Sequence, residues 1–199
     1  MPDSQTDDIS KGLSDQAFEI AKRRQKAARE ALQLFEKEFD PAVGAHPETV
    51  LHAAAWLAGT SLHRSFGYTE EQAPGTIMLS EKANQEWPKL MKTFMFLLEK
   101  DGFKLGPDEL VLKFPGEHGP KMNMLEVQQR FQAAYNEIMR KHGFDYAEGG
   151  KTGAVICALL AKVYCVRRKD LAPGLAAGIV EMGFIEGTKT APAPLEAQK

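Results

Sequence analysis

The sequence predicts an all-α protein, a single-domain bundle of five to six helices, and three observations lead to this prediction. Apolar residues recur at steps of three or four along most of the chain, which keeps one face of each helix apolar. Four glycines followed by aromatic residues come directly after such segments, as helix-terminating glycines do. The chain has 199 residues, 43% of them hydrophobic and 26% charged, which is the size and composition of one soluble domain.

The first predicted helix covers residues 14–39 and is amphipathic. Six apolar residues share one of its faces: Phe18, Ala21, Ala28, Leu32, Phe35 and Phe39. Four basic residues lie opposite them: Lys22, Arg23, Lys26 and Arg29. We expect a helical domain over residues 13–187, preceded by a disordered segment at residues 1–12.

The second predicted helix begins at Pro47, because proline is favoured in a first helical turn, and runs to about residue 65. Its middle is built from small residues: Ala53, Ala54, Ala55, Ala58 and Gly59. Small side chains allow two helices to approach closely. We therefore expect another helix to pack tightly against this one.

The third and fourth helices are predicted from their periodicity and their start signals. The third pattern begins at Ser80 and stays in phase across Pro88, so either the helix bends at this proline or it begins there. We favour the bend. Asn123 is followed three residues later by Glu126, which is the spacing of a capping box and opens the fourth helix.

The fifth predicted helix, about residues 146–168, is apolar almost all round, and we expect it to be the central helix of the bundle. It begins after Asp145, again with a glutamate three residues later. A last short helix is predicted over residues 171–182, with Asp170 as its cap and Pro173 in its first turn.

The glycine and aromatic pairs predict where helices end. These pairs are Gly67 with Tyr68, Gly102 with Phe103, Gly143 with Phe144, and Gly183 with Phe184. Two connections, residues 66–79 and 103–120, are long for a helical bundle, and long loops in compact domains often carry function. Within the second loop, residues 109–114 look like a strand. Residues 188–199 are predicted to form a disordered tail.

Charge and hydropathy exclude several classes of partner. The 25 basic and 27 acidic residues give a net charge of −2, which removes the electrostatic reason for nucleic-acid binding. The first residues are acidic and polar, unlike a secretory signal, and the longest apolar stretch, residues 153–166, is shorter than the roughly 20 residues of a membrane-spanning helix. Cys157 and Cys165 lie too far apart on one helix to form a disulfide. We therefore expect a cytoplasmic protein with reduced cysteines, no nucleic-acid partner and no membrane span.

The second helix carries the first candidate for a binding site. Glu48, His52, Trp56 and His63 form one stripe along this helix, beside its small residues. His52 and His63 are about 16 Å apart along the helix, at ~1.5 Å per residue, so they cannot share a metal ion. We expect no metal and no cofactor. Two interpretations stay open: Glu48 and His52 form a simple hydrogen-bonded pair, or the stripe lines a groove for a small apolar or planar ligand.

Lys151 is a further candidate, because it lies in a glycine-rich helix start, Glu-Gly-Gly-Lys-Thr-Gly. The glycine spacing does not match a phosphate loop, and the preceding segment is helical where that loop requires a strand. A helix amino terminus nevertheless attracts anions, so Lys151 could contact a phosphate or carboxylate. The alternative is that Gly149 and Gly153 serve only close helix packing. Further along, Lys162 is expected to reach solvent or to meet a carboxylate.

Two function classes are compatible with these features. The one we favour is a binding or interaction module that self-associates, because the second and fifth helices both present small-residue faces that a six-helix chain need not cover. The other is a small-molecule sensor or an enzyme that uses the groove beside His52, Trp56 and His63. A concave pocket with convergent polar groups would favour the second class, and an exposed apolar patch the first.

Overall fold

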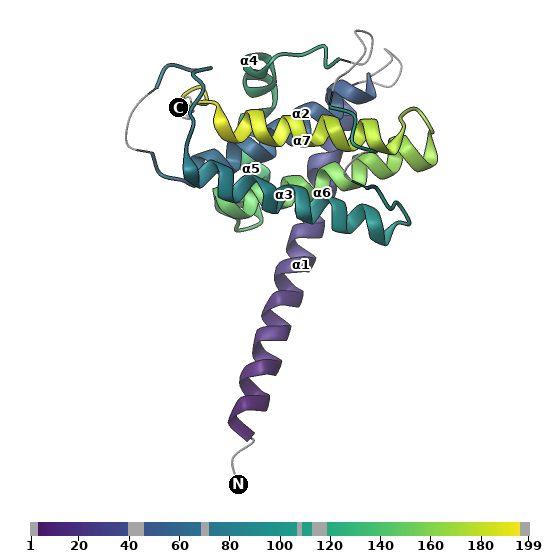
Figure 1. Cartoon of the computed structure of the whole chain (residues 1–199). Helices are drawn as coiled ribbons and strands as arrows, with labels where there is room; N and C mark the ends of the chain where they lie inside the picture. Colours follow the sequence, from purple (N-terminus) through teal and green to yellow (C-terminus); the bar gives the residue numbers. More distant parts are fainter. Residues whose placement is uncertain (1–3, 40–45, 69–71, 107–108, 113–118, 196–199) are drawn as a thin grey trace.

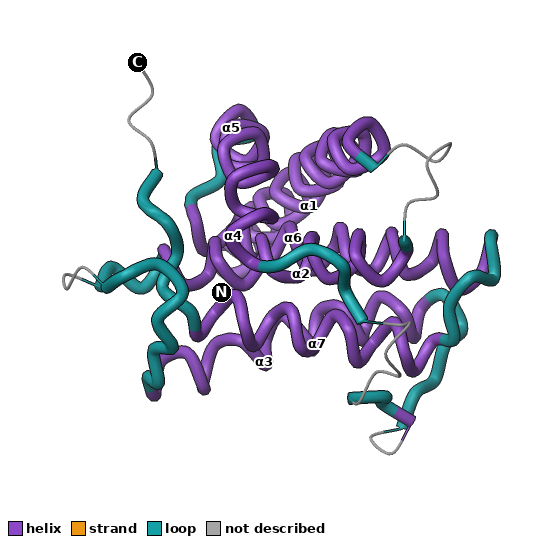
Figure 2. The backbone as a smooth tube through the Cα atoms, turned by 90° about the horizontal axis from the view of Figure 1, so that it is seen from above, coloured by secondary structure: helices purple, strands orange, loops and turns teal. Residues whose placement is uncertain are grey.

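The computed structural model of the chain describes residues 4–39, 46–68, 72–106, 109–112 and 119–195, with side chains from residue 15 onward. The described residues form an all-α bundle without strands. Its α-helices are α1 (Ser4–Glu38), α2 (Pro47–Arg64), α3 (Glu81–Lys100), α4 (Met124–Val127), α5 (Ala133–Lys141), α6 (Tyr146–Lys162) and α7 (Pro173–Lys189). Two π-helical segments, η4 (Gln128–Gln132) and η5 (Val163–Arg167), join α4 to α5 and extend α6. Figures 1 and 2 show α2, α3, α6 and α7 side by side in the body, whereas α1 crosses them and projects beyond it.

The small residues of α2 place this helix in the middle of the body. Every residue of α2 from Glu48 to His63 is buried. A Cβ atom added at Gly183 would lie 2.6 Å from Ala55 Cβ, and one added at Gly187 would lie 3.1 Å from Gly59 Cα. The contacts advance in the same order along both helices, so α7 runs parallel to α2 at close range. The closely packed neighbouring helix that the small residues of α2 predict is therefore α7.

The predicted central apolar helix, α6, packs against α2 from another side and also contacts α1 and α3. Gly149 faces Ser61 and Gly153 faces Ala58, so α6 runs antiparallel to α2. Together α6 and η5 are long and apolar enough to cross a membrane by length and composition alone, but 61% of their most apolar window is buried in the body. Such burial is typical of a core helix in a soluble protein. The small-residue faces of α2 and α6 are thus covered within one chain, which removes the reason for expecting a dimer through them.

The predicted helix starts are largely confirmed. Asn123 and Glu126 form a reciprocal capping box, and the Asp145 side chain accepts a hydrogen bond from the Glu148 amide. Ser80 caps α3, which continues through Pro88 instead of beginning there. The start of α7 differs from the prediction, because Ala172 is the N-cap and Asp170 is not.

Three of the four predicted helix-ending glycines are confirmed, and one prediction is wrong. Gly67, Gly102 and Gly143 have φ values of 66°, 93° and 71°, the left-handed conformation expected after a helix. Gly183, by contrast, lies inside α7, which runs on to Lys189. The sequence pattern cannot distinguish these cases, since a glycine is equally useful where two helices touch.

The chain ends and the strand-like segment also differ from expectation. Helix α1 begins at Ser4, within the segment expected to be disordered, and residues 1–3 and 196–199 lie outside the described residues. Residues 188–193 were expected to belong to a disordered tail, but residues 188 and 189 end α7 and the following residues bind to the body. Ala191 exchanges backbone hydrogen bonds with the loop at residues 75–76, and the Gln128 side chain accepts a hydrogen bond from the Ala193 amide. The described part of the strand-like segment, residues 109–112, crosses α7 at Gly174, whose carbonyl accepts a hydrogen bond from the Val111 amide.

Candidate functional site

The candidate stripe on α2 lies under α7. His52, Trp56 and His63 are each only 5% exposed. His52 Nε2 lies 2.9 Å from a carboxylate oxygen of Glu186 on α7. Glu48 is also buried, and one of its carboxylate oxygens lies 3.2 Å from Nδ1 of His46, one residue before α2. His52 therefore contributes to the α2–α7 contact, and the buried stripe does not line a groove open to solvent.

His63 is separated from the other stripe residues and has a hydrogen-bond partner of its own. Its Nδ1 lies 2.8 Å from the carbonyl oxygen of Thr188. A carbonyl oxygen can only accept, so Nδ1 carries the proton. Burial lowers the pKa of His63 below its ordinary value of 6.5, although the hydrogen bond to Thr188 opposes this shift. His63 is therefore a neutral core histidine near neutral pH.

Lys151 lies at the rim of a surface pocket, which we call the three-helix pocket. Its volume is about 210 Å³, and its lining residues are Leu62, Ser65, Phe66, Lys82, Glu86, Lys89, Leu90, Ala147 and Lys151. The first three come from the end of α2 and the residues after it, the next four from one face of α3, and the last two from the first turns of α6. The pocket exists only because these three segments meet.

The floor of the three-helix pocket is apolar. Leu62, Phe66 and Leu90 are between 2% and 9% exposed and belong to the hydrophobic core. Ser65 closes one side, and its hydroxyl donates a 2.6 Å hydrogen bond to the Leu62 carbonyl. Because the hydroxyl proton of Ser65 is already donated to this carbonyl, the side chain is not an activated nucleophile. Its oxygen can still accept a hydrogen bond from a ligand.

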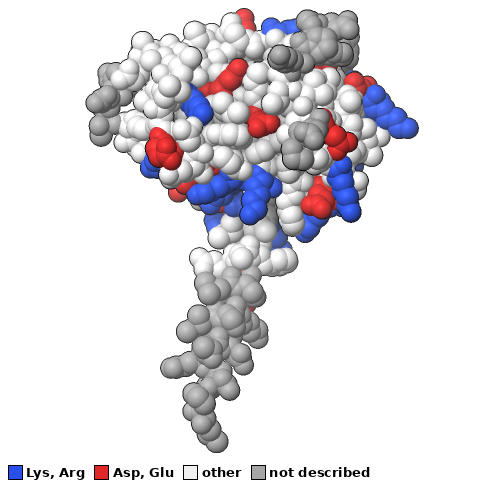
Figure 3. Space-filling view, viewed as in Figure 1, with Lys and Arg blue, Asp and Glu red and all other residues white. Residues whose placement is uncertain are grey.

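The rim of the pocket is basic. Lys82 Nζ lies 3.4 Å from the Phe66 carbonyl oxygen and 5.1 Å from the centre of the Phe66 ring. Lys89 pairs with Glu86 at 2.6 Å, and Lys151 pairs with Glu148 at 2.6 Å. The charged lining residues are therefore three lysines and one glutamate, and two of the lysines, Lys89 and Lys151, are already paired with carboxylates. Figure 3 shows Lys and Arg atoms gathered on the lower side of the body, with acidic groups between them.

Glu148 connects the pocket rim to α1. It accepts hydrogen bonds from Lys151 and from Arg24 of α1. Burial alone would raise the pKa of Glu148, but the hydrogen bonds from Lys151 and Arg24 outweigh it and lower the pKa. Glu148 is thus ionised near neutral pH, and it holds Lys151 close to the start of α6.

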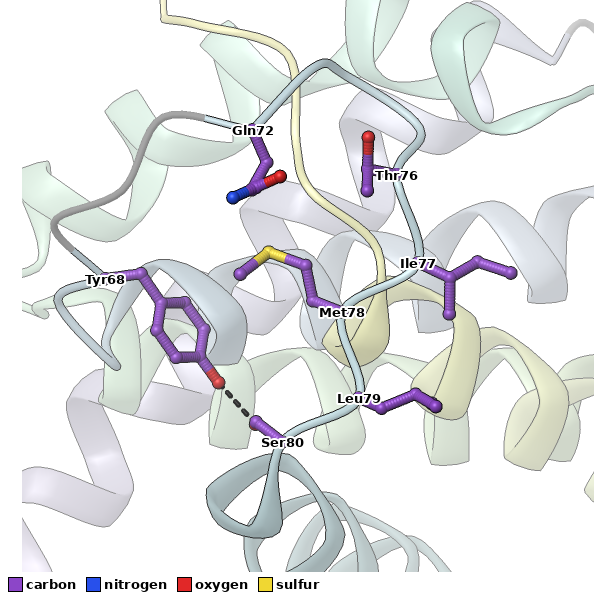
Figure 4. Close-up of a pocket in the computed structure, with 7 residues that line it drawn as sticks. All are labelled: Tyr68, Gln72, Thr76, Ile77, Met78, Leu79 and Ser80. Carbon is purple, nitrogen blue, oxygen red and sulfur yellow. Dashed lines mark hydrogen bonds between the residues drawn. The ribbon is translucent and has the colours of Figure 1, made fainter.

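A larger hollow, of about 510 Å³, lies in the loop before α3 and is lined by Tyr68, Gln72 and residues 76–80. In Figure 4, Met78 points between Tyr68 and Gln72, whereas Ile77 and Leu79 point the other way. The Tyr68 hydroxyl is hydrogen-bonded to Ser80. None of these lining residues is charged at neutral pH. A ligand could contact this hollow, but it would find no charged group there to fix its orientation.

Comparison with known proteins adds no assignment. No protein-family profile, curated protein or solved structure matches this chain. Within the described residues, no group of three or more His, Cys, Asp or Glu side chains is placed to hold a metal ion. The function must therefore be inferred from the geometry of the chain.

Of the residues singled out in the sequence, only Lys151 lies at an open site. Sequence reasoning missed Lys82, Lys89 and the apolar floor. The spacing of seven between Lys82 and Lys89 does place both on one face of a helix. Nothing local in the sequence indicates that this face meets the start of α6.

Proposed function

We propose that the protein is a binding module for a small organic anion, a carboxylate or phosphate attached to a compact apolar group, and that the three-helix pocket holds this ligand. One observation carries the proposal: Lys82, Lys89 and Lys151, from two helices, surround a floor of buried apolar side chains. A cytoplasmic location stays a prediction, supported by Cys157 and Cys165, neither of which forms a disulfide.

The size and chemistry of the pocket limit the ligand. Pockets for drug-sized molecules usually have volumes of about 300–1,000 Å³, so 210 Å³ suits a smaller molecule with one ring or a short chain. The apolar part would displace water from Leu62, Phe66 and Leu90. The anionic group would remain at the rim, where the lysine ammonium groups can reach it.

The affinity should be modest. The side chains of Lys89 and Lys151 are 67% and 55% exposed, and exposed ion pairs contribute only about 0–1 kcal/mol each. A ligand of eleven non-hydrogen atoms such as phenyl phosphate, at about 0.4 kcal/mol per atom, would bind with about 4 kcal/mol and a Kd of about 1 mM.

The lining residues favour binding over catalysis. They include no histidine or cysteine, and the Ser65 hydroxyl donates to a backbone carbonyl. The stripe of His52, Trp56 and His63, proposed from the sequence as an enzyme or sensor site, lies under α7 and lines neither described hollow. The stripe therefore offers a ligand no surface at either hollow.

Calorimetric titration of the full chain with phenyl phosphate, and with phenol as the uncharged match, tests the proposal. We expect phenyl phosphate to bind at least about tenfold more tightly than phenol, because only the anion uses the rim. Combining Lys82→Glu with Lys151→Glu should weaken phenyl phosphate at least about tenfold. Lys92→Glu, on the same helix but outside the lining, should leave binding within about twofold. Equal affinities for the two ligands, or equal losses in the double variant and the control, would refute the proposal.

A further inference from the structure

The three lysines of the three-helix pocket differ in what they already bind. Lys89 and Lys151 each donate a 2.6 Å hydrogen bond to a carboxylate. Lys82 has no carboxylate partner among the described residues. Its Nζ lies 3.4 Å from the Phe66 carbonyl oxygen, which is long for a hydrogen bond, and 5.1 Å from the centre of the Phe66 ring. Lys82 therefore has the most donor capacity left for a ligand.

Glu86 is the one carboxylate among the lining residues, and it lies between two of the lysines. It is four residues after Lys82 and three before Lys89, so the three side chains share one face of α3. A sphere with the pocket volume of 210 Å³ is about 7 Å across, which is less than the Debye length of about 8 Å at physiological salt. Salt therefore does not fully screen a bound anion from Glu86.

Lys151 offers its charge to a ligand only in competition with Glu148. Its Nζ donates to one oxygen of this carboxylate, and Arg24 of α1, which does not line the pocket, donates to the other. These hydrogen bonds lower the pKa of Glu148, so the carboxylate stays ionised near neutral pH. An anion that binds Lys89 or Lys151 must share the lysine with a carboxylate, whereas Lys82 requires no such exchange.

We propose that the three-helix pocket selects singly charged anions, in particular a carboxylate on a compact apolar group, over doubly charged phosphates. The anion is held by Lys82, and Glu86 sets the selectivity. This inference rests on the proposed function, because it names the class of anion that the same pocket binds. The attraction of an anion to Lys82 grows in proportion to its charge, whereas the cost of taking it out of water grows with the square of its charge. A second charge on the ligand also doubles its repulsion by Glu86.

Phenyl sulfate and phenyl phosphate are a matched pair of probes, because both join a phenyl ring through an oxygen to a tetrahedral group. At pH 8 the sulfate carries one charge and the phosphate, with a second pKa of about 6, carries two. In calorimetric titrations of the full chain, phenyl sulfate and benzoate should each bind about three- to fivefold more tightly than phenyl phosphate. Phenyl phosphate binding as tightly as phenyl sulfate, or more tightly, would overturn the selectivity. If none of these anions binds better than phenol, the proposed function itself is refuted, and this inference with it.

Glu86→Gln tests whether this residue sets the selectivity. Loss of the carboxylate should strengthen phenyl phosphate binding about threefold or more and phenyl sulfate binding less, so the ratio of the two affinities should move towards one. Glu99→Gln is the matched control, because it removes the same charge from an exposed position of α3 outside the lining. It should leave the ratio unchanged. An unchanged ratio in Glu86→Gln, or the same change in both variants, would overturn the role of Glu86.

Lys82→Gln and Lys151→Gln test which lysine holds the anion, since each variant removes one positive charge from the lining. Lys82→Gln should weaken phenyl sulfate binding about threefold or more. Lys151→Gln should weaken it less, because Lys151 is already bound to Glu148. Equal losses in the two variants, or a larger loss in Lys151→Gln, would overturn the assignment of the anion to Lys82.

Discussion

Replacing Gly59 by alanine tests the contact between α2 and α7 that organises the body. The added Cβ would lie 2.7 Å from the Phe184 carbonyl oxygen and 2.8 Å from the Thr188 amide nitrogen. Both are backbone atoms and cannot rotate away, so the two helices must move apart by roughly half an ångström or more to restore ordinary contact. Overpacking of this kind destabilises proteins by about 1–3 kcal/mol.

The net effect combines this overpacking with the better helix propensity of alanine. Alanine in a helix is favoured over glycine by about 1 kcal/mol. With backbone atoms in conflict, the overpacking lies at the upper end of its range, so we expect a net loss of about 2 kcal/mol. For a protein of this size, that loss lowers Tm by about 4–8 °C.

Gly149→Ala is the matched control, because Gly149, like Gly59, is a helical glycine at a contact with a neighbouring helix: it lies in α6 and faces Ser61 of α2. Its added Cβ would meet only side-chain atoms, the nearest being Ser61 Oγ at 3.4 Å. We expect this variant to be as stable as the natural chain or more stable by up to about 1 kcal/mol. Thermal unfolding followed by circular dichroism compares the two. Equal Tm values for Gly59→Ala and Gly149→Ala would refute the close contact between α2 and α7.

Two titrating groups give further predictions. Burial lowers the pKa of His63, so the unfolded chain takes up a proton that the folded chain resists, and stability should fall as pH drops below about 6.5. His63→Asn should flatten the change in unfolding free energy between pH 7 and 5, measured with urea, and an unchanged slope would contradict this role. Burial also raises the pKa of Glu181, one of whose carboxylate oxygens is buried without a hydrogen-bond partner among the described residues. Its ionised form destabilises the fold near neutral pH and is relieved as pH falls through the raised pKa, so Glu181→Gln should raise Tm at pH 7 and have less effect at pH 4. A decrease of Tm at pH 7 would contradict it.

Local signals in the sequence predicted the helices well where neighbouring residues decide the outcome. The capping box at Asn123, the N-cap at Asp145 and the glycines after α2, α3 and α5 act within a few residues, and the sequence identifies them. Gly183 is a case that local signals do not predict, because it lies inside α7 and not at a helix end. Its role depends on Ala55, more than a hundred residues away, and no local pattern distinguishes a helix end from a helix contact.

The candidate site shows the same limit. The stripe of His52 and Trp56 does lie beside small residues, as the sequence indicates, but α7 fills the space that a groove would need. Lys151 was found through its place at a helix start. The other half of its pocket, on α3, is joined to it only by tertiary packing.

The most direct test of the proposed function is to locate the bound anion by amide chemical shifts of the full chain titrated with phenyl phosphate. The three-helix pocket predicts the largest shifts at Leu62, Lys82, Ala147 and Lys151, with small shifts along the Tyr68 loop. Phenol at the same concentrations should shift these amides less. Shifts spread evenly over exposed lysines, or concentrated in the loop hollow, would contradict the assignment of the ligand to this pocket.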